Sequence, residues 1–209
     1  MNRILGYDIE DMRKNKENVD TPEQKRSVRR TKAALRNGLI ELMKTRSILR
    51  ISVKEICDAA DIGRSTFYIH YKSQYELLEE IETDCLIVFE EKLHMNQPLR
   101  KFNDREITQK FEKMLQFIAD NSNSIQTLLN ENGDIFFQRK FIHRLINYIK
   151  SAKNHYADNS LKDETSECYS VFVVHGAIAL VQHWLNNGMH IPVSDLAKML
   201  VILTREMRK

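Results

Sequence analysis

Hydrogen-bond donors crowd one short segment of the chain, the stretch GRSTFYIHYKSQYELL that begins at Gly63. Its first nine residues after Gly63 carry seven donor side chains, and only Phe67, Ile69 and Tyr71 could serve a core. The donors are Arg64, Ser65, Thr66, Tyr68, His70, Tyr71 and Lys72. Such side chains bind phosphate oxygens and base edges, so the chemistry that they offer is recognition of a polyanion rather than bond making.

The surrounding charge favours the same kind of partner. From Lys25 to Lys72 the chain has 12 basic and 4 acidic residues, a net charge of +8, whereas all 209 residues together carry +3. The rest of the chain is therefore acidic overall. A basic module joined to a mildly acidic body predicts that only the first part meets a polyanion.

No residue pattern is typical of catalysis or of a metal site. His175 and His183 are eight residues apart, but no HExxH motif or Cys-His cluster accompanies them, so each is interpreted as a buried or pocket-lining histidine. The three cysteines form no CxxC motif, which favours reduced thiols in a cytoplasmic protein. We expect no enzyme activity, no cofactor and no metal.

The sequence also predicts no membrane partner. Residues 1–24 lack the apolar segment of a signal peptide and are expected to form a flexible extension. The longest apolar stretch, VFVVHGAIALV, is interrupted by His175 and is expected to be too short to span a bilayer.

Helices must position the donors, because apolar residues recur at spacings of three and four and no segment alternates with period two. The first helix is expected from Ser27 to about Arg46. Two capping boxes, Ser52 with Glu55 and Ser73 with Glu76, predict the starts of a second and a fourth helix. Apolar stripes at helical spacing continue to the C-terminus, so the predicted fold is all-α.

The second and third helices match a helix-turn-helix layout, in which the later helix lies in the major groove. A short helix that ends near Ala60 is followed by a tight turn with Gly63 and a helix from Arg64. Phe67 and Tyr71, four residues apart, are expected to anchor that helix, which leaves its other side chains to face DNA.

The third helix divides into two predicted roles. Residues in its first turn reach base edges, and Arg64 there could bind guanine O6 and N7. Later donors can bind phosphates, and basic residues of the first helix lie where that helix meets the DNA backbone. The predicted DNA-binding residues are Arg30, Ser52, Lys54, Arg64, Ser65, Thr66, Tyr68, His70 and Lys72.

The segment ISVKEICDAADIGRSTFYIHYKSQYELL resembles the DNA-binding domain of the TetR/AcrR family of bacterial transcription regulators. The block Phe67-Tyr68-x-x-Tyr71 followed by KSQYELL carries most of the resemblance. It implies that Tyr68 binds a phosphate and that His70 faces DNA. Gln74 stands where the family usually has a lysine, so one phosphate contact would be weaker here.

The resemblance also implies a domain organisation. A three-helix helix-turn-helix domain at 25–72 would be joined through the fourth helix to a helical effector-binding and dimerisation domain at 73–209. Four phenylalanines are predicted to line an effector pocket, although their helical spacing also suits an ordinary core. They are Phe89, Phe111, Phe137 and Phe141.

The segment YSVFVVHGAIALVQHWLNNGMHIPVSDLAKML is similar to a C-terminal domain of TetR-like regulators of low-GC Gram-positive bacteria. The resemblance implies that the last two long helices of each subunit form a four-helix dimer interface. Small residues there permit close helix approach, and an apolar helix needs cover on every side. The predicted interface residues are Phe172, Gly176, Ala179, Leu180, Trp184, Leu196, Leu200 and Leu203.

These features predict a homodimer that regulates transcription by binding a pseudo-palindrome in double-stranded DNA. A repressor released by a small-molecule effector is the main hypothesis, and the effector follows from the resemblance alone. Two alternatives stay open. One is a regulator that needs no ligand or acts through a protein partner, including an activator, and the other is a nucleoid-type protein with little sequence preference.

Overall fold

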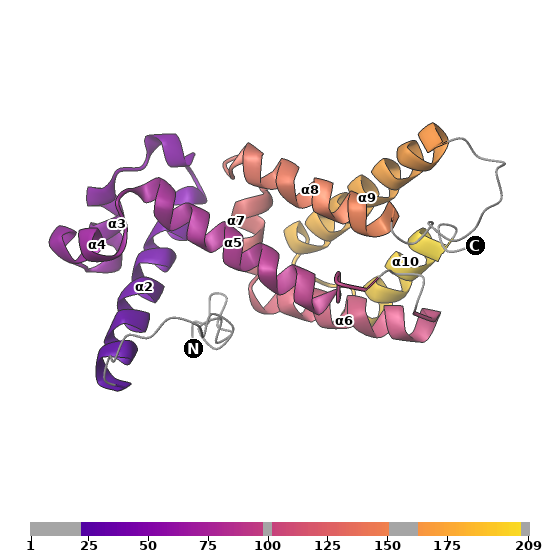
Figure 1. Ribbon diagram of the computed structural model, residues 1–209, viewed down its shortest axis with the longest axis horizontal. Helices are drawn as coiled ribbons and strands as arrows, with labels where there is room; N and C mark the ends of the chain where they lie inside the picture. The colour runs from indigo at the N-terminus through magenta and orange to yellow at the C-terminus, as the bar shows by residue number, and fades with distance from the viewer. Residues whose placement is uncertain (1–21, 98–101, 151–162, 206–209) are drawn as a thin grey trace. The chain divides into compact units, whose positions relative to one another are not determined.

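The computed structural model describes residues 22–97, 102–150 and 163–205, and within these ranges it contains helices, turns and loops but no strand. The all-α prediction is thereby confirmed, while most of the predicted extension 1–24 lies outside the described residues. The elements are α2 (Pro22–Met43), the 3-10 turn η1 (Ile48–Arg50), α3 (Val53–Ala60), α4 (Arg64–His70), α5 (Gln74–Lys92), α6 (Asp104–Asp120), α7 (Ser122–Leu129), α8 (Ile135–Lys150), α9 (Asp163–Asn186) and α10 (Val193–Arg205) (Figure 1).

The chain divides into two compact units, and the division falls within α5. The first unit extends to residue 85 and also includes 123–134, and the second consists of 86–122 and 135–209. The first unit is therefore larger than the helix-turn-helix domain predicted at 25–72, because it takes in the first part of α5 and most of α7.

The capping chemistry of the first unit agrees with the sequence. Ser52 accepts a hydrogen bond from the Glu55 backbone N–H, and the Glu55 carboxylate accepts one from the Ser52 N–H at 2.9 Å. The α3 helix ends at Asp61, which adopts the left-handed region with φ of 53°. Gly63, by contrast, has φ of −63° and so is not required by the backbone of the turn. Asp61 therefore supplies the conformation that turns the chain from α3 into α4.

Gly38 lets α2 approach α3 closely. A Cβ atom at this position would lie 3.0 Å from the Ile56 carbonyl oxygen and 3.3 Å from the Ala60 amide nitrogen. Both neighbours are backbone atoms, so they can give way only if α3 shifts. The glycine therefore belongs to the packing of the two helices that precede α4.

We expect Gly38→Ala to lower the free energy of unfolding by about 1–3 kcal/mol, because overpacking outweighs the better helix propensity of alanine. Urea denaturation measures the change. Gly63→Ala is the control, since its Cβ would meet only the side chains of Ser65 and Thr66 at 3.8 and 3.9 Å. Equal stability of Gly38→Ala and the wild type would contradict this account of the α2–α3 contact.

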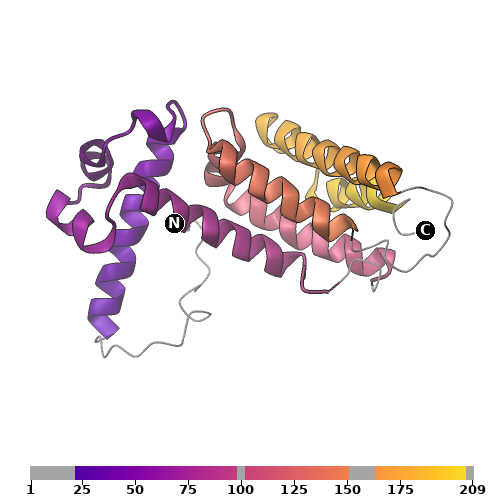
Figure 2. The same cartoon turned by 45° about the horizontal axis from the view of Figure 1, so that its top comes forward.

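The second unit is a helical bundle in which α8 packs beside α9 and α6 beside α10 (Figure 2). The predicted α6 stripe of Phe111, Met114, Leu115 and Ile118 is buried. Gly188 ends α9 with φ of +70°, which confirms the predicted left-handed cap.

The α9 helix extends well beyond VFVVHGAIALV, the stretch on which the expectation about membranes rested. By length and composition Glu167–Asn186 could cross a membrane, since its 20 residues include a window with a mean hydropathy of 1.4, whereas VFVVHGAIALV alone was expected to be too short. About a third of that window is buried in the subunit. A helix that packs against protein on several sides has the same composition. Whether lipid or protein surrounds it, α9 needs more apolar contact than the subunit alone provides.

Candidate nucleic-acid interface

The α4 helix is held by two aromatic anchors, as predicted. Phe67 and Tyr71 are buried, and their ring centroids lie 5.7 Å apart. Ile69 is apolar enough to serve a core, but it is 76% exposed, like the other side chains that the two anchors leave outside. All α4 side chains except the anchor Phe67 are therefore exposed or half-buried, and apolar Ile69 is among the exposed ones.

The structure brings the predicted donors of α4 together on its outer surface. Arg64, Ser65 and Tyr68 are exposed, and so is Lys72 just beyond the end of the helix, whereas Thr66 and His70 are half-buried at its edges. This display of donors on a helix with two anchors is the arrangement that a recognition helix requires.

The remaining predicted contacts lie on the two preceding helices. Arg30 on α2, Ser52 and Lys54 at the start of α3 are all exposed. The Ser52 hydroxyl is already engaged, because it donates to the Glu55 carboxylate at 2.7 Å and accepts from the Glu55 amide. The first role of the Ser52 hydroxyl is therefore to cap α3. Lys54, by contrast, carries a charge that is exposed to solvent.

The surroundings of His70 favour the uncharged form of its imidazole ring. Burial lowers its pKa, and the positive charge of Lys32 lowers it further, against an opposing effect of Glu80. At neutral pH the imidazole therefore carries one N–H donor and no charge. It can donate to a phosphate, but it adds less attraction than Lys72.

An ionic network, centred on Glu80 of α5, fastens the end of α4 to its scaffold. The Glu80 carboxylate accepts hydrogen bonds from Lys32 at 2.9 Å, Arg36 at 2.6 Å and the Tyr71 hydroxyl at 3.0 Å. The Lys32 ammonium also lies 5.3 Å above the Tyr71 ring. One carboxylate thus joins α2, the residue that caps α4, and α5.

Arg36 connects the same network to a second carboxylate. Its guanidinium donates to Asp84, one turn beyond Glu80 on α5, and both side chains of this pair are largely buried. Lys32 and Arg36 are basic residues of the first helix, which was expected to meet the DNA backbone, but the structure pairs both side chains with carboxylates of α5. The sequence held a signal for this pairing, since basic residues four apart on α2 face acidic residues four apart on α5.

The pKa values of the network follow from these contacts. Burial raises the pKa of Glu80, but the hydrogen bond from Lys32 and the charge of Arg36 outweigh burial and hold it at about 2. Burial and the charge of Glu80 together raise the pKa of Tyr71. Glu80 is therefore ionised and Tyr71 is a neutral donor at physiological pH.

The predicted dimer residues fall into two groups in the second unit. Trp184, Leu196 and Leu200 are buried within the subunit, and the Trp184 indole donates to the Ile191 carbonyl at 2.8 Å. These three residues belong to the core, so their assignment to an interface is corrected. The exposed or half-buried members are Phe172, Gly176, Ala179, Leu180 and Leu203.

Further apolar side chains extend the exposed group along α9 and α10. Val171 lies next to Phe172, while Met199 and Ile202 lie near Leu203, and all of them are exposed. Apart from the two neighbouring residues and the backbone of α9 itself, no heavy atom lies within 4 Å of the position that a Cβ on Gly176 would take, so its surface is open to an approaching helix. We refer to Val171, Phe172, Gly176, Ala179, Met199, Ile202 and Leu203 as the α9–α10 face.

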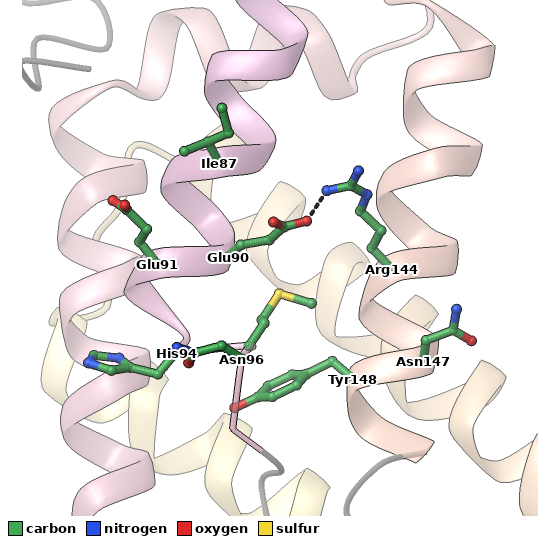
Figure 3. Close-up of a pocket in the computed structure, with 9 residues that line it drawn as sticks. Ile87, Glu90, Glu91, His94, Asn96, Arg144, Asn147 and Tyr148 are labelled. Atoms are coloured by element: carbon green, nitrogen blue, oxygen red, sulfur yellow. Dashed lines mark hydrogen bonds and ion pairs between the residues drawn. The ribbon is translucent and has the colours of Figure 1, made fainter. Parts of the chain in front are cut away.

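A pocket of about 870 Å³ opens in the second unit between the end of α5 and α8. Figure 3 shows the Glu90 carboxylate and the Arg144 guanidinium reaching toward each other from these two helices, where they form an ion pair. Tyr148 borders the pocket and donates its hydroxyl to the Leu93 carbonyl at 2.9 Å. The lining residues are Ile87, Glu90, Glu91, His94, Met95, Asn96, Arg144, Asn147 and Tyr148.

The four phenylalanines predicted to line an effector pocket are not among those residues. Phe89, Phe111, Phe137 and Phe141 are buried, and the ring centroids of Phe89 and Phe141 are 4.9 Å apart. Their packing is that of an aromatic core. Within the described ranges, no group of three or more His, Cys, Asp and Glu side chains could hold a metal ion.

Two family models match the chain at the places where these features lie. The model described as "Bacterial regulatory proteins, tetR family" matches residues 36–81, which contain α3 and α4. The model described as "Transcriptional regulator C-terminal region" matches residues 105–206. Together they cover more than half of the sequence, in the order that TetR-type regulators have. The chain belongs to the TetR family of transcriptional regulators.

Relatives of this TetR-family regulator agree with that assignment. The "Uncharacterized HTH-type transcriptional regulator YxbF" of Bacillus subtilis (strain 168) is 31% identical over 52 residues. That segment is 25% of this chain and 14% of the relative, so the chain matches a small part of that protein.

Solved structures show the fold of the regulator over most of its length. A TetR transcriptional regulator from Streptococcus agalactiae 2603V is 24% identical with a TM-score of 0.59, and the match covers 87% of this chain and 97% of the other. The "Dihydroxyacetone kinase operon activator DhaS" is 19% identical with a TM-score of 0.52, covering 84% and 94%. A TetR-family regulator from Streptomyces coelicolor is 15% identical with a TM-score of 0.54, covering 84% and 81%.

As a TetR-family member the chain is a DNA-binding regulator and not an enzyme. The exposed surface of α4 is its candidate DNA contact, since the family model for the DNA-binding domain spans that helix.

Proposed function

We propose that the protein is a homodimeric repressor that binds a pseudo-palindromic operator in the cytoplasm and is released by a small-molecule effector. The observation that carries the proposal is the outer surface of α4, where donors and charges are exposed around a helix held by Phe67 and Tyr71. Two such helices in a symmetric dimer would read half-sites about one DNA turn apart.

The homodimer is supported by the α9–α10 face. It gathers exposed apolar side chains on two neighbouring helices, with small residues at Gly176 and Ala179. Patches of this kind mark protein interfaces in soluble proteins, and a two-fold axis buries the same patch on both subunits. Cover by a second copy would also account for the apolar composition of α9.

The effector is supported by the pocket between α5 and α8. Its volume lies within the range of small-molecule sites, and it combines apolar Ile87 and Met95 with the Glu90–Arg144 ion pair. Because α5 belongs to both units, a ligand bound at its end could favour one position of the helix over another. Such a ligand changes DNA affinity only through unequal affinity for the two states.

The direction of regulation is a separate question, because one structural neighbour is named an operon activator. A reporter driven by the gene's own promoter distinguishes the two. Repression predicts higher expression when the regulator is deleted, whereas an activator predicts lower expression.

We expect Arg64→Ala to weaken operator binding by about 1–3 kcal/mol and to relax specificity at one base position. Arg64 is exposed in the first turn of α4, the part of a recognition helix that reaches base edges. Binding measured against a panel of single-base operator variants gives both quantities. Arg139→Ala, which removes an exposed arginine from α8, should leave the panel unchanged.

A fall of equal size on every sequence would contradict base reading by Arg64. That outcome would assign the guanidinium to a phosphate instead.

A further inference from the structure

Ile69 is an apolar side chain that the protein leaves uncovered on its recognition helix. Its exposed fraction is 76%, compared with 59% for Tyr68, while Phe67 is completely buried. The isoleucine therefore adds little to the stability of the described part of the first unit, and its side chain is available for contact with a partner.

The geometry of α4 places Ile69 at the centre of the outward surface. Successive residues of an α-helix are about 100° apart, so Ile69 points almost directly away from the anchor Phe67. Ser65, one turn earlier, lies on nearly the same line. The donors flank this line on both sides: Arg64 and Tyr68 on one, Thr66 and His70 on the other.

A helix in the major groove turns the centre of its outward surface toward the base edges. A long side chain in its first turn, such as Arg64, also reaches a base edge from the flank, whereas later flanking donors lie closer to the phosphates. Ile69 has no hydrogen-bonding group, so it cannot read a donor or an acceptor. The apolar group that base pairs display in the major groove is the C5-methyl of thymine.

We propose that Ile69 is a specificity-determining residue that packs against the methyl group of one thymine in each half-site. The proposal rests on the proposed function, because it requires a preferred operator. The contact gives the protein a preference for thymine that depends on the C5-methyl group. Uracil has the same hydrogen-bonding groups as thymine but lacks this methyl, so it would not be preferred.

Exposure alone would not support this role, since single exposed apolar residues are common on soluble proteins. Leu49 illustrates the point, because it is 78% exposed on η1 and lies outside α4. The two residues are matched in apolar character and exposure and differ in position. Leu49 is therefore the control.

The test uses operator DNA in which single thymines are replaced by deoxyuridine, which lacks only the C5-methyl group. The preferred site is first selected from a random duplex library with the full-length protein. Each thymine of that site is then replaced in turn, symmetrically in both half-sites, and affinity is measured at fixed salt. We expect the wild type to lose about fourfold per half-site at one position, from the transfer free energy of a single methyl group.

The variants identify the side chain that makes the contact. Ile69→Ala should bind the thymine and uracil operators equally, and Ile69→Val should keep most of the difference. Leu49→Ala should keep all of it. Melting temperatures of the three variants should match the wild type, because both side chains are exposed in the folded subunit.

The proposal is overturned if the wild type shows no uracil penalty at any thymine, or if Ile69→Ala retains the penalty. A library that yields no preferred site would contradict the proposed function itself, and this inference would fail with it. A preferred site without a methyl effect would contradict this inference alone.

Discussion

Replacing Arg36 with methionine is expected to lower the free energy of unfolding by about 3–5 kcal/mol. The side chain is only 12% exposed, and it pairs with Glu80 and with the still more buried Asp84. Methionine retains much of the aliphatic volume but removes the guanidinium, so two carboxylates one turn apart on α5 lose the charge between them. Because the network also holds Tyr71 at the end of α4, operator binding should weaken as well.

The pH dependence of this loss identifies its cause. The pKa of Glu80 in the folded protein is about 2, below the ordinary value of 4.5. A lowered pKa means that the ionised carboxylate stabilises the fold above about pH 4.5 and that this contribution disappears as the pH falls toward 2. The difference in unfolding free energy between wild type and Arg36→Met should therefore shrink across this interval.

Arg46→Met is the matched control for this experiment. Arg46 pairs with Glu55 at 2.7 Å in the same unit, but both side chains are more than a third exposed. Exposed ion pairs contribute at most about 1 kcal/mol, so Arg46→Met should be nearly as stable as the wild type. A loss for Arg36→Met that is equally small, or that does not change with pH, would contradict the buried network.

Phe172→Asp is expected to convert the protein into a folded monomer and to weaken operator binding by at least about 100-fold. Phe172 belongs to the α9–α10 face and is 72% exposed in the subunit, so a carboxylate there costs little in the monomer. In a dimer it would be buried opposite its own copy. Loss of the second recognition helix removes the gain from binding two linked half-sites, which is typically 100-fold to 10,000-fold.

Sedimentation equilibrium gives the oligomeric state, and circular dichroism verifies the fold. Phe136→Asp is the control, because Phe136 is 73% exposed on α8, outside the α9–α10 face. It should remain dimeric with normal operator affinity. A Phe172→Asp protein that stays dimeric and binds the operator normally would place the interface elsewhere.

The sequence predicted the elements that depend on local chemistry. The capping box at Ser52 and Glu55, the left-handed cap at Gly188 and the anchors Phe67 and Tyr71 are all found where they were expected. Each of these follows from residues close together in the chain, so a single segment contains the whole signal.

Features that depend on distant segments were harder to predict. Lys32 and Arg36 look like surface cations until α5 places Glu80 and Asp84 beside them. Trp184, by the same reasoning, cannot be distinguished from an interface residue, because an apolar helix shows its buried and exposed sides only once its neighbours are packed.

Ile69 was only partly predicted. The anchors Phe67 and Tyr71 left it among the side chains expected to face DNA, but the sequence assigned it no role there, because its exposed fraction depends on how α4 packs on its scaffold. The four phenylalanines are the opposite case, because residues expected to line a pocket are buried in the core of the second unit.

The most direct test of the account is competition binding at fixed salt between the gene's own promoter and random duplex DNA of the same length. A sequence-specific regulator should bind the promoter about 1,000-fold more tightly or better, because base contacts add to the phosphate contacts that all DNA shares. Equal affinity for the two duplexes would contradict the proposed function and would favour a nucleoid-type protein instead.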